Sequence, residues 1–345
     1  MGILLAVPVV SILALSLFLG FGLRDLRALG RYLVHRKAPA ATGWQAPEPE
    51  GDLVDFAVTG ESRILALREG GLWEVDGGAL RPLEASQGLL HLFPDGDGGR
   101  IWVAGTYHRV MVWEAPEGLH YVLSVRGEVR GVQRRGDRLA VGFEEAGLGS
   151  GQVQLFHRRM GASFEPEGLE IAVGMDRWSG FDLSPDGLRL VANLPGGNGV
   201  GVWSAEDGRL LASWPAERLA RVLCFIDNER VLFDAGPALK IRDAAYAHPG
   251  NRLLVARVGV SGEITVIAGN FAAVLSAARW PSLSRMAFSD MEGLVRVVEL
   301  GSEPRLAMIF APKERGIPWQ VRPGGNGLWV LLKGEKARVE RFGLD

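Results

Sequence analysis

The sequence predicts an all-β chain of seven four-stranded units, arranged as the blades of a β-propeller and preceded by one transmembrane α-helix. Two observations carry this expectation: a long uncharged run at the N-terminus, and a pattern of short strands that recurs seven times after it. A third supports it, because 47 of the 345 residues are glycine and 18 are proline. Helical proteins tolerate fewer of these residues, so many turns are expected.

Composition excludes several classes of protein. The chain has 38 lysine and arginine residues against 40 aspartate and glutamate residues, a net charge of -2. Domains that bind nucleic acid through bulk charge are strongly basic, so we expect no nucleic-acid partner. The one cysteine, Cys224, leaves no internal disulfide and no multi-cysteine metal site, and we expect no disulfide partner. Leu223 and Phe225 flank it, which favours a small buried apolar side chain.

Residues 1–23 are predicted to form the transmembrane helix. The run ILLAVPVVSILALSLFLGFGL, residues 3–23, contains no charge and is long enough to cross the roughly 30 Å hydrocarbon core of a bilayer. A cleaved signal peptide is the competing interpretation. It fits less well, because no lysine or arginine precedes the run and the run exceeds the roughly 7 to 15 residues of a signal sequence's apolar region.

Residues 24–37 form a basic segment directly after the span. Positive charge stays on the cytoplasmic side, so we expect a single-pass protein of a bacterial inner membrane, with its N-terminus outside and the propeller in the cytoplasm. Leucines recur at intervals of three to four residues in this segment, which suits an amphipathic helix on anionic lipid head groups. A simple continuation of the membrane helix is the alternative. The predicted membrane-interface residues are Arg24, Arg27, Arg31, Arg36 and Lys37.

Residues 38–51, rich in proline and alanine, are predicted to form a tether to a propeller of residues 52–345. An extended polyproline-like tether of this length reaches at most about 40 Å. The propeller is therefore expected close to the membrane.

The clearest repeat unit spans residues 180–214. It contains four predicted strands, at 181–183, 188–193, 199–203 and 209–214, separated by turns rich in glycine and aspartate. Its second strand, RLVAN, resembles six others: RILAL (63–67), RIWVA (100–104), RLAVGF (138–143), RVLFD (230–234), RMAFSD (285–290) and LWVLL (328–332). Its third strand, GVGVW, resembles GLWEV (71–75), VMVWE (110–114), GQVQLF (151–156), ALKIRD (238–243), GLVRVVEL (293–300) and ARVERF (337–342).

Seven units over residues 51–345 average about 42 residues each, which is typical of propeller blades. The unit at 221–271 is longer than the others. Further strands at 252–258 and 263–269 leave an eight-bladed or irregular ring as an alternative.

Residues 180–214 resemble a WD40 repeat, on the motif FDLSPDGLRLVA followed by GVGVWSAEDGRLLASW. The other units resemble degenerate copies. The Gly-His pair of the family is absent, and its Trp-Asp pair survives only in altered form, as in Trp113-Glu114 and Trp203-Ser204. We therefore expect apolar packing to hold the blades. The resemblance also implies ring closure by an N-terminal strand, expected at 44–54, in the blade of residues 318–344.

No reaction motif accompanies this architecture. The sequence has no HExxH, no CxxC, no Walker loop and no GxSxG. The prediction is a non-enzymatic protein with no catalytic residue, no cofactor and no metal. Since propellers assemble active sites from loops of several blades, a propeller hydrolase or small-ligand-binding protein that uses the axial channel is the alternative.

The candidate site is a partner-binding face. In the WD40 family, the loops before each first strand and those between second and third strands share one face. Aromatic and arginine residues are frequent anchors of protein interfaces. In this chain those loops contain Tyr107, His108, Arg109, Arg177, Trp178 and Trp319.

These features favour a membrane-anchored scaffold or accessory subunit that stabilises a larger membrane protein complex. Its expected partners are integral membrane protein subunits and anionic lipid head groups. Energy-converting and secretion assemblies are both candidate hosts. An exported domain with an inverted or cleaved anchor is a third hypothesis.

Overall fold

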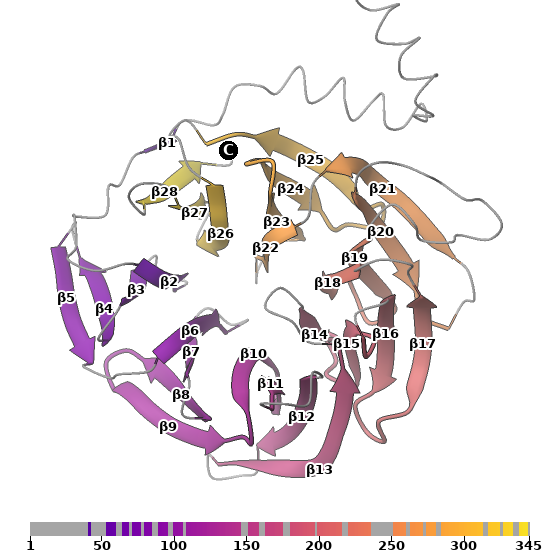
Figure 1. Ribbon diagram of the computed structural model, residues 1–345, viewed down its shortest axis with the longest axis horizontal. Helices are drawn as coiled ribbons and strands as arrows, with labels where there is room; N and C mark the ends of the chain where they lie inside the picture. The colour runs from indigo at the N-terminus through magenta and orange to yellow at the C-terminus, as the bar shows by residue number, and fades with distance from the viewer. Residues whose placement is uncertain are drawn as a thin grey trace, which may run out of the picture.

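The computed structural model forms a closed ring of seven antiparallel sheets, each with four strands (Figure 1). The seven-bladed, WD40-like propeller expected from the sequence is confirmed. The structure describes residues 41–42, 53–59, 64–68, 71–76, 79–84, 89–95, 99–105, 108–145, 151–158, 163–174, 180–196, 199–215, 220–235, 251–259, 263–271, 274–280, 284–312, 317–324, 327–333 and 338–343.

The blades are numbered in chain order, and each runs from its inner strand at the ring axis to its outer strand. Blade 1 consists of β2 (Leu53–Val58), β3 (Ile64–Arg68), β4 (Gly71–Asp76) and β5 (Ala79–Glu84). Blade 2 consists of β6 (Leu89–Pro94), β7 (Arg100–Gly105), β8 (Arg109–Glu114) and β9 (Gly118–Ser124). Blade 3 consists of β10 (Glu128–Arg135), β11 (Arg138–Glu144), β12 (Gly151–Arg158) and β13 (Phe164–Val173).

Blade 4, the clearest repeat, consists of β14 (Phe181–Leu183), β15 (Arg189–Asn193), β16 (Gly199–Ser204) and β17 (Leu210–Pro215). Blade 5 consists of β18 (Ala220–Phe225), β19 (Arg230–Ala235), β20 (Asn251–Arg257) and β21 (Ile264–Phe271). Blade 6 consists of β22 (Val274–Arg279), β23 (Arg285–Asp290), β24 (Val295–Glu299) and β25 (Arg305–Phe310). Blade 7 consists of β26 (Ile317–Gly324), β27 (Gly327–Lys333), β28 (Arg338–Gly343) and β1 (Ala41–Thr42).

Burial explains why the central strands read as continuous apolar runs. In blade 4, β15 and β16 are buried along almost their whole length, because neighbouring blades cover both faces of the sheet. The outer strand β17 is partly exposed. The central strands therefore carry the strongest repeat signal.

Blade 5 corrects the predicted third strand at 238–243. The strand paired with β19 is β20, in a register from Arg230 opposite Arg257 to Ala235 opposite Arg252. The predicted strands at 252–258 and 263–269 are thus the third and fourth strands of this blade. Residues 236–250, which include 238–243, are an insertion outside the described residues. The insertion lengthens the repeat without adding a blade, so the ring has seven blades rather than eight.

Ring closure uses an N-terminal strand, at a different position from the one expected. β1 pairs with β28, with Ala41 opposite Phe342 and Thr42 opposite Arg341. Leu53 and Val54 belong instead to β2, the inner strand of blade 1. The physical reason is the path of the chain, because it must cross from the outer edge of blade 7 to the axis before blade 1 begins. Residues 43–52, which connect β1 to β2 in the sequence, lie outside the described residues.

We expect closure to depend on β1. A chain lacking residues 1–42 should melt a few degrees lower than one lacking residues 1–38, because the edge of β28 loses its ladder bonds at about 1 kcal/mol each. It should also self-associate, since an unpaired edge strand templates pairing with another chain. Calorimetry and size-exclusion chromatography measure both effects. Equal melting temperatures and equal elution would show that β1 does not close the ring.

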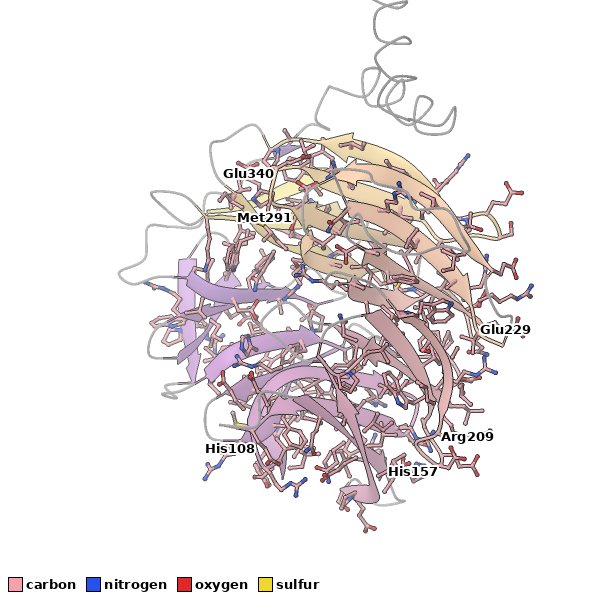
Figure 2. All side chains as sticks on the ribbon, turned by 45° about the vertical axis from the view of Figure 1, so that its right-hand side comes forward. His108, His157, Arg209, Glu229, Met291 and Glu340 are labelled. Carbon is pink, nitrogen blue, oxygen red and sulfur yellow. The ribbon has the colours of Figure 1, made fainter. Side chains whose placement is uncertain are left out.

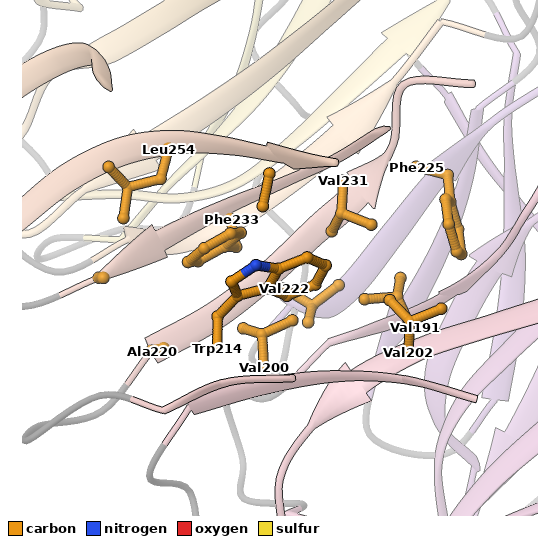
Figure 3. Close-up of a cluster of buried hydrophobic side chains, with 12 residues drawn as sticks. Val191, Val200, Val202, Trp214, Ala220, Val222, Phe225, Val231, Phe233 and Leu254 are labelled. Atoms are coloured by element: carbon orange, nitrogen blue, oxygen red, sulfur yellow. The ribbon is translucent and has the colours of Figure 1, made fainter. Parts of the chain in front are cut away.

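Seven apolar clusters fill the junctions between neighbouring blades, one at each junction. Figure 3 shows the cluster between blades 4 and 5, where Trp214 of β17 packs near Phe233 of β19 with ring centroids 6.0 Å apart. Cys224 is buried at the junction of blades 5 and 6, with its sulfur 3.8 Å from that of Met286. This confirms its expected place in the core.

No helix in the described part of the chain is long and apolar enough to span a membrane. The predicted helix of residues 1–23 and the basic segment of residues 24–37 lie outside the described residues. Of the predicted tether, residues 38–51, only β1 is described, and it is part of blade 7.

Candidate partner-binding face

The ring has two faces, which we call top and bottom. The top face carries the loops between second and third strands and the loops that lead into each next blade. The bottom face carries the other two sets of loops. In Figure 2, His108 and Met291 of the top face lie on one side of the ring. His157, Arg209 and Glu229 of the bottom face lie on the other.

Three of the six predicted partner-binding residues are described. His108 and Arg109 are exposed on the top face, where the chain turns from β7 into β8. His108 has a φ of 58°, and its carbonyl accepts a hydrogen bond from the amide of Val125 at 2.8 Å. This bond ties the turn to the loop that enters blade 3. Tyr107, Arg177 and Trp178 lie outside the described residues.

Trp319, the third, is a half-buried residue near the start of β26. Its ring packs against the apolar cluster between blades 7 and 1. The Nζ atom of Lys333, at the end of β27, lies 4.5 Å from the ring centroid. Trp319 therefore contributes to packing between blades while its partly exposed side and the lysine belong to the top face.

Two exposed apolar residues extend this region. Met291, in the turn after β23, is 65% exposed, and Ile317, the first residue of β26, is 49% exposed. Both lie at the top ends of contacting strands, since β23 and β26 pack against each other. Because all four residues lie at the top ends of blades 6 and 7, we group Met291 and Ile317 with Trp319 and Lys333 as the blade 6/7 patch. Methionine and tryptophan are frequent in protein-binding surfaces, and here two exposed apolar side chains accompany a half-buried tryptophan and its neighbouring cation.

Of these two residues, only Met291 carried a signal in the sequence. Met291 occupies a turn of the sequence SDMEG, where polar residues are the norm, and an apolar residue there is an anomaly that could have been noticed. Ile317 follows a segment without strand periodicity, so its exposure could not be predicted from the sequence. Three other large apolar residues are exposed, Leu188 and Leu210 on the bottom of blade 4 and Tyr121 on the outer strand of blade 2.

Polar contacts join the inner strands at all seven junctions, and we call this set the inner girdle. In blades 3 to 5, Arg135 donates from Nη2 to Oδ1 of Asp182 at 3.1 Å, and Oδ2 of Asp182 accepts from the amide of Phe225 at 2.9 Å. One carboxylate thus connects three blades. Burial raises the pKa of Asp182, while Arg135 acts in the opposite direction.

The same arrangement recurs in blades 7, 1 and 2. Arg322 donates from Nη2 to Oδ1 of Asp55 at 3.4 Å, and Oδ2 of Asp55 accepts from the amide of Leu92 at 2.8 Å. In both copies the arginine also donates from Nη1 to the carbonyl of the residue before it, Arg134 or Val321. This repetition marks the arrangement as a structural motif of the ring.

The remaining three junctions complete the girdle. Arg134 donates to Asp95 between blades 3 and 2 at 2.9 Å. Arg279 donates to the carbonyl of Phe225 between blades 6 and 5 at 2.7 Å. The amide of Val321 donates to Oγ of Ser276 between blades 7 and 6 at 3.3 Å. The sequence-based expectation that apolar packing mainly holds the blades did not include this second, polar system.

The ionisable groups of the inner girdle have structural roles. Its carboxylates accept hydrogen bonds from arginines and backbone amides of adjacent blades. His91 of β6 is largely buried beside this system, and burial lowers its pKa below the ordinary value of 6.5 while Asp55 raises it. The histidine is therefore neutral at pH 7. Within the described ranges, no cluster of three or more histidine, cysteine, aspartate or glutamate side chains has the arrangement of a metal site.

Comparison with known proteins supports the fold. No protein-family model and no curated protein matches the sequence. Solved structures do: a chain of the mitotic checkpoint complex is similar at 12% identity and TM-score 0.62, over 90% of this chain and 95% of that one. The RRP9 WD40 repeats are similar at 14% identity and TM-score 0.58, over 90% and 99%. A chain of Kuenenia stuttgartiensis hydrazine synthase is similar at 13% identity and TM-score 0.61, over 87% and 98%.

These similarities define the class of protein, a WD40-like seven-bladed β-propeller. At such identities they show the fold alone.

Proposed function

We propose that this chain is a non-enzymatic, membrane-anchored scaffold or accessory subunit whose cytoplasmic propeller stabilises a larger membrane protein complex. Energy-converting and secretion assemblies are the candidate hosts. The single observation that carries the proposal is the blade 6/7 patch. It consists of an exposed methionine and isoleucine and a half-buried tryptophan with its lysine, all at the top ends of two neighbouring blades.

The anchor supports the membrane part of the proposal. The run of residues 3–23 has only Ser11 and Ser16 as polar side chains, which suits packing against other helices rather than ion or electron transfer. Two linked contacts, one in the bilayer and one through the propeller, gain by effective concentration. Each contact alone should then hold the chain weakly.

The blade 6/7 patch gives the test of this function. Met291→Asp combined with Ile317→Asp should reduce retention of the full-length chain in the detergent-purified complex at least tenfold, because an interface anchor contributes about 1.4 kcal/mol or more. The matched control, Leu188→Asp with Leu210→Asp, places the same charges on exposed bottom positions of blade 4 and should leave retention unchanged.

Retention is measured as the molar ratio of this chain to the complex after gel filtration. The domain lacking residues 1–37 and the anchor alone should each be retained less than the full chain. Equal retention of the top and bottom variants would reject the blade 6/7 patch as the contact. A propeller that turns over a small substrate unaided would reject the scaffold itself.

A further inference from the structure

The direction of β1 fixes where the N-terminal segment enters the ring. β28 runs from the top face, where it follows β27, to the bottom face at Gly343. β1 pairs with it antiparallel, with Ala41 opposite Phe342 and Thr42 opposite Arg341. The chain therefore enters blade 7 at the bottom and leaves β1 toward the top. Figure 1 shows β1 at the outer edge of this blade.

The chain between the basic segment and β1 is short. Only residues 38–40 separate Lys37 from Ala41. Fully extended, the four peptide units from Lys37 to Ala41 span about 14 Å. This is far less than the reach of about 40 Å expected for a tether of residues 38–51.

The two faces of the ring lie at different distances from the point where the chain enters blade 7. Strands of five to eight residues, such as β24 (Val295–Glu299) and β26 (Ile317–Gly324), run from one face to the other. At about 3.3 Å per residue, this separates the faces by about 20 Å. A membrane near the bottom edge of blade 7 is therefore well removed from the blade 6/7 patch.

From this geometry we infer that the propeller stands on the membrane through the bottom edge of blade 7. The bottom edge contacts the lipid head-group surface. The top face of the propeller is turned toward the part of the host complex that projects from the membrane. The inference rests on the proposed membrane anchor. It deepens that proposal by naming which surface meets lipid and which meets protein.

The experiment compares two fluorophore positions at opposite ends of one blade. Ser302→Cys places a label in the exposed bottom turn between β24 and β25, and Met291→Cys places one in the exposed top turn between β23 and β24. The native Cys224 is buried and burial raises the pKa of its thiol to about 12, so a maleimide dye leaves it unlabelled in the folded protein. Unmodified full-length protein serves as the labelling control.

Each full-length variant is reconstituted into vesicles of phosphatidylcholine and phosphatidylglycerol that carry a quencher on the lipid head group. The Ser302→Cys label should be quenched several-fold more strongly than the Met291→Cys label. Equal quenching, or stronger quenching at Met291→Cys, would overturn the orientation while leaving the anchor intact. Protein that an alkaline wash strips from the vesicles would instead refute the anchor, and the orientation with it.

Discussion

Replacement of Asp182 by alanine is expected to lower the free energy of unfolding by about 3–5 kcal/mol. The carboxylate is buried on β14 and accepts hydrogen bonds from Arg135 of blade 3 and from the amide of Phe225 of blade 5. Alanine leaves a partly buried guanidinium and a buried amide without this acceptor. The expected loss is large because one residue joins three blades.

The measurement is urea-induced unfolding of a soluble domain that begins at residue 39 and keeps β1. Asp182→Asn is the informative control, since its amide oxygen still accepts from Phe225 and the charge is removed. Asp182→Asn should lower the free energy of unfolding much less than Asp182→Ala does. Asp207→Ala tests a carboxylate on an exposed turn and should change stability little.

A double-mutant cycle isolates the ion pair. Arg135→Met in the Asp182→Ala background removes the unpaired guanidinium, so the two changes together should cost less than the sum of the single changes. If Asp182→Ala unfolds at the same urea concentration as the parent domain, the inner girdle does not stabilise the ring.

The blades were predictable because their central strands are buried on both faces. Strands such as β15 and β23 carry a run of apolar residues in their buried middle, and the turns between strands need glycine, proline or aspartate, so each unit repeats a recognisable pattern. The pattern indicated both the fold class and the number of blades. It needed no conserved Trp-Asp pair.

The inner girdle was not predictable for a physical reason. Arg135 and Asp182 lie 47 positions apart in the sequence and meet only when blades 3 and 4 close against each other. From the sequence, a single arginine or aspartate in a strand is normally interpreted as a solvent-facing residue. Its recurrence on the inner strands, as in Asp55 and Arg322, is the one signal that could have been noticed.

The predictions of the closing strand and of the third strand of blade 5 were wrong for local reasons. A two-residue strand such as β1 has no periodicity to detect, and its place depends on the pairing with β28. In blade 5, the stretch ALKIRD at 238–243 alternates apolar and charged residues and so resembled a strand, whereas the ladder with β19 is formed by β20. The partner-binding role of the candidate face stays a prediction: the fold shows His108 and Arg109 exposed on it, and the exposure of Met291 and Ile317 became visible only in the fold.

Replacement of Asp234 by asparagine is expected to stabilise the domain at neutral pH. Asp234 is buried near the end of β19 and accepts a hydrogen bond from Nδ2 of Asn251 at 3.0 Å. Burial raises the pKa of its carboxyl to about 6, against the opposing attraction of Arg221. The folded ring thus holds an ionised carboxylate at pH 7 at a cost that a neutral amide avoids.

The neighbouring blade shows that asparagine fits this position. Asn193 is the fifth residue of β15, as Asp234 is of β19. Its Oδ1 accepts from the amide of Val222 at 3.3 Å, and its Nδ2 donates to the carbonyl of Ala220 at the start of the next blade. Asp234 likewise accepts from the amide of Val274, at the start of blade 6.

The sign of the pH dependence follows from proton binding. Between the unfolded pKa of 3.8 and the folded pKa of about 6, the folded state of the parent domain holds more protons at Asp234 than the unfolded state. Its stability therefore falls as the pH rises through this window, by up to about 3 kcal/mol, and the loss is complete above pH 6. Asp234→Asn removes this dependence, so its advantage over the parent should be greatest at pH 7 and should shrink toward pH 4.

Urea unfolding of both domains across this pH range gives the difference directly, because the other carboxylates contribute to both. The reciprocal variant, Asn193→Asp, introduces a buried carboxylate at the equivalent position of blade 4 and should destabilise the domain more at pH 7 than at pH 5. If Asp234→Asn is less stable than the parent at pH 7, the contacts of the carboxylate with Arg221 and Asn251 outweigh the cost of its burial.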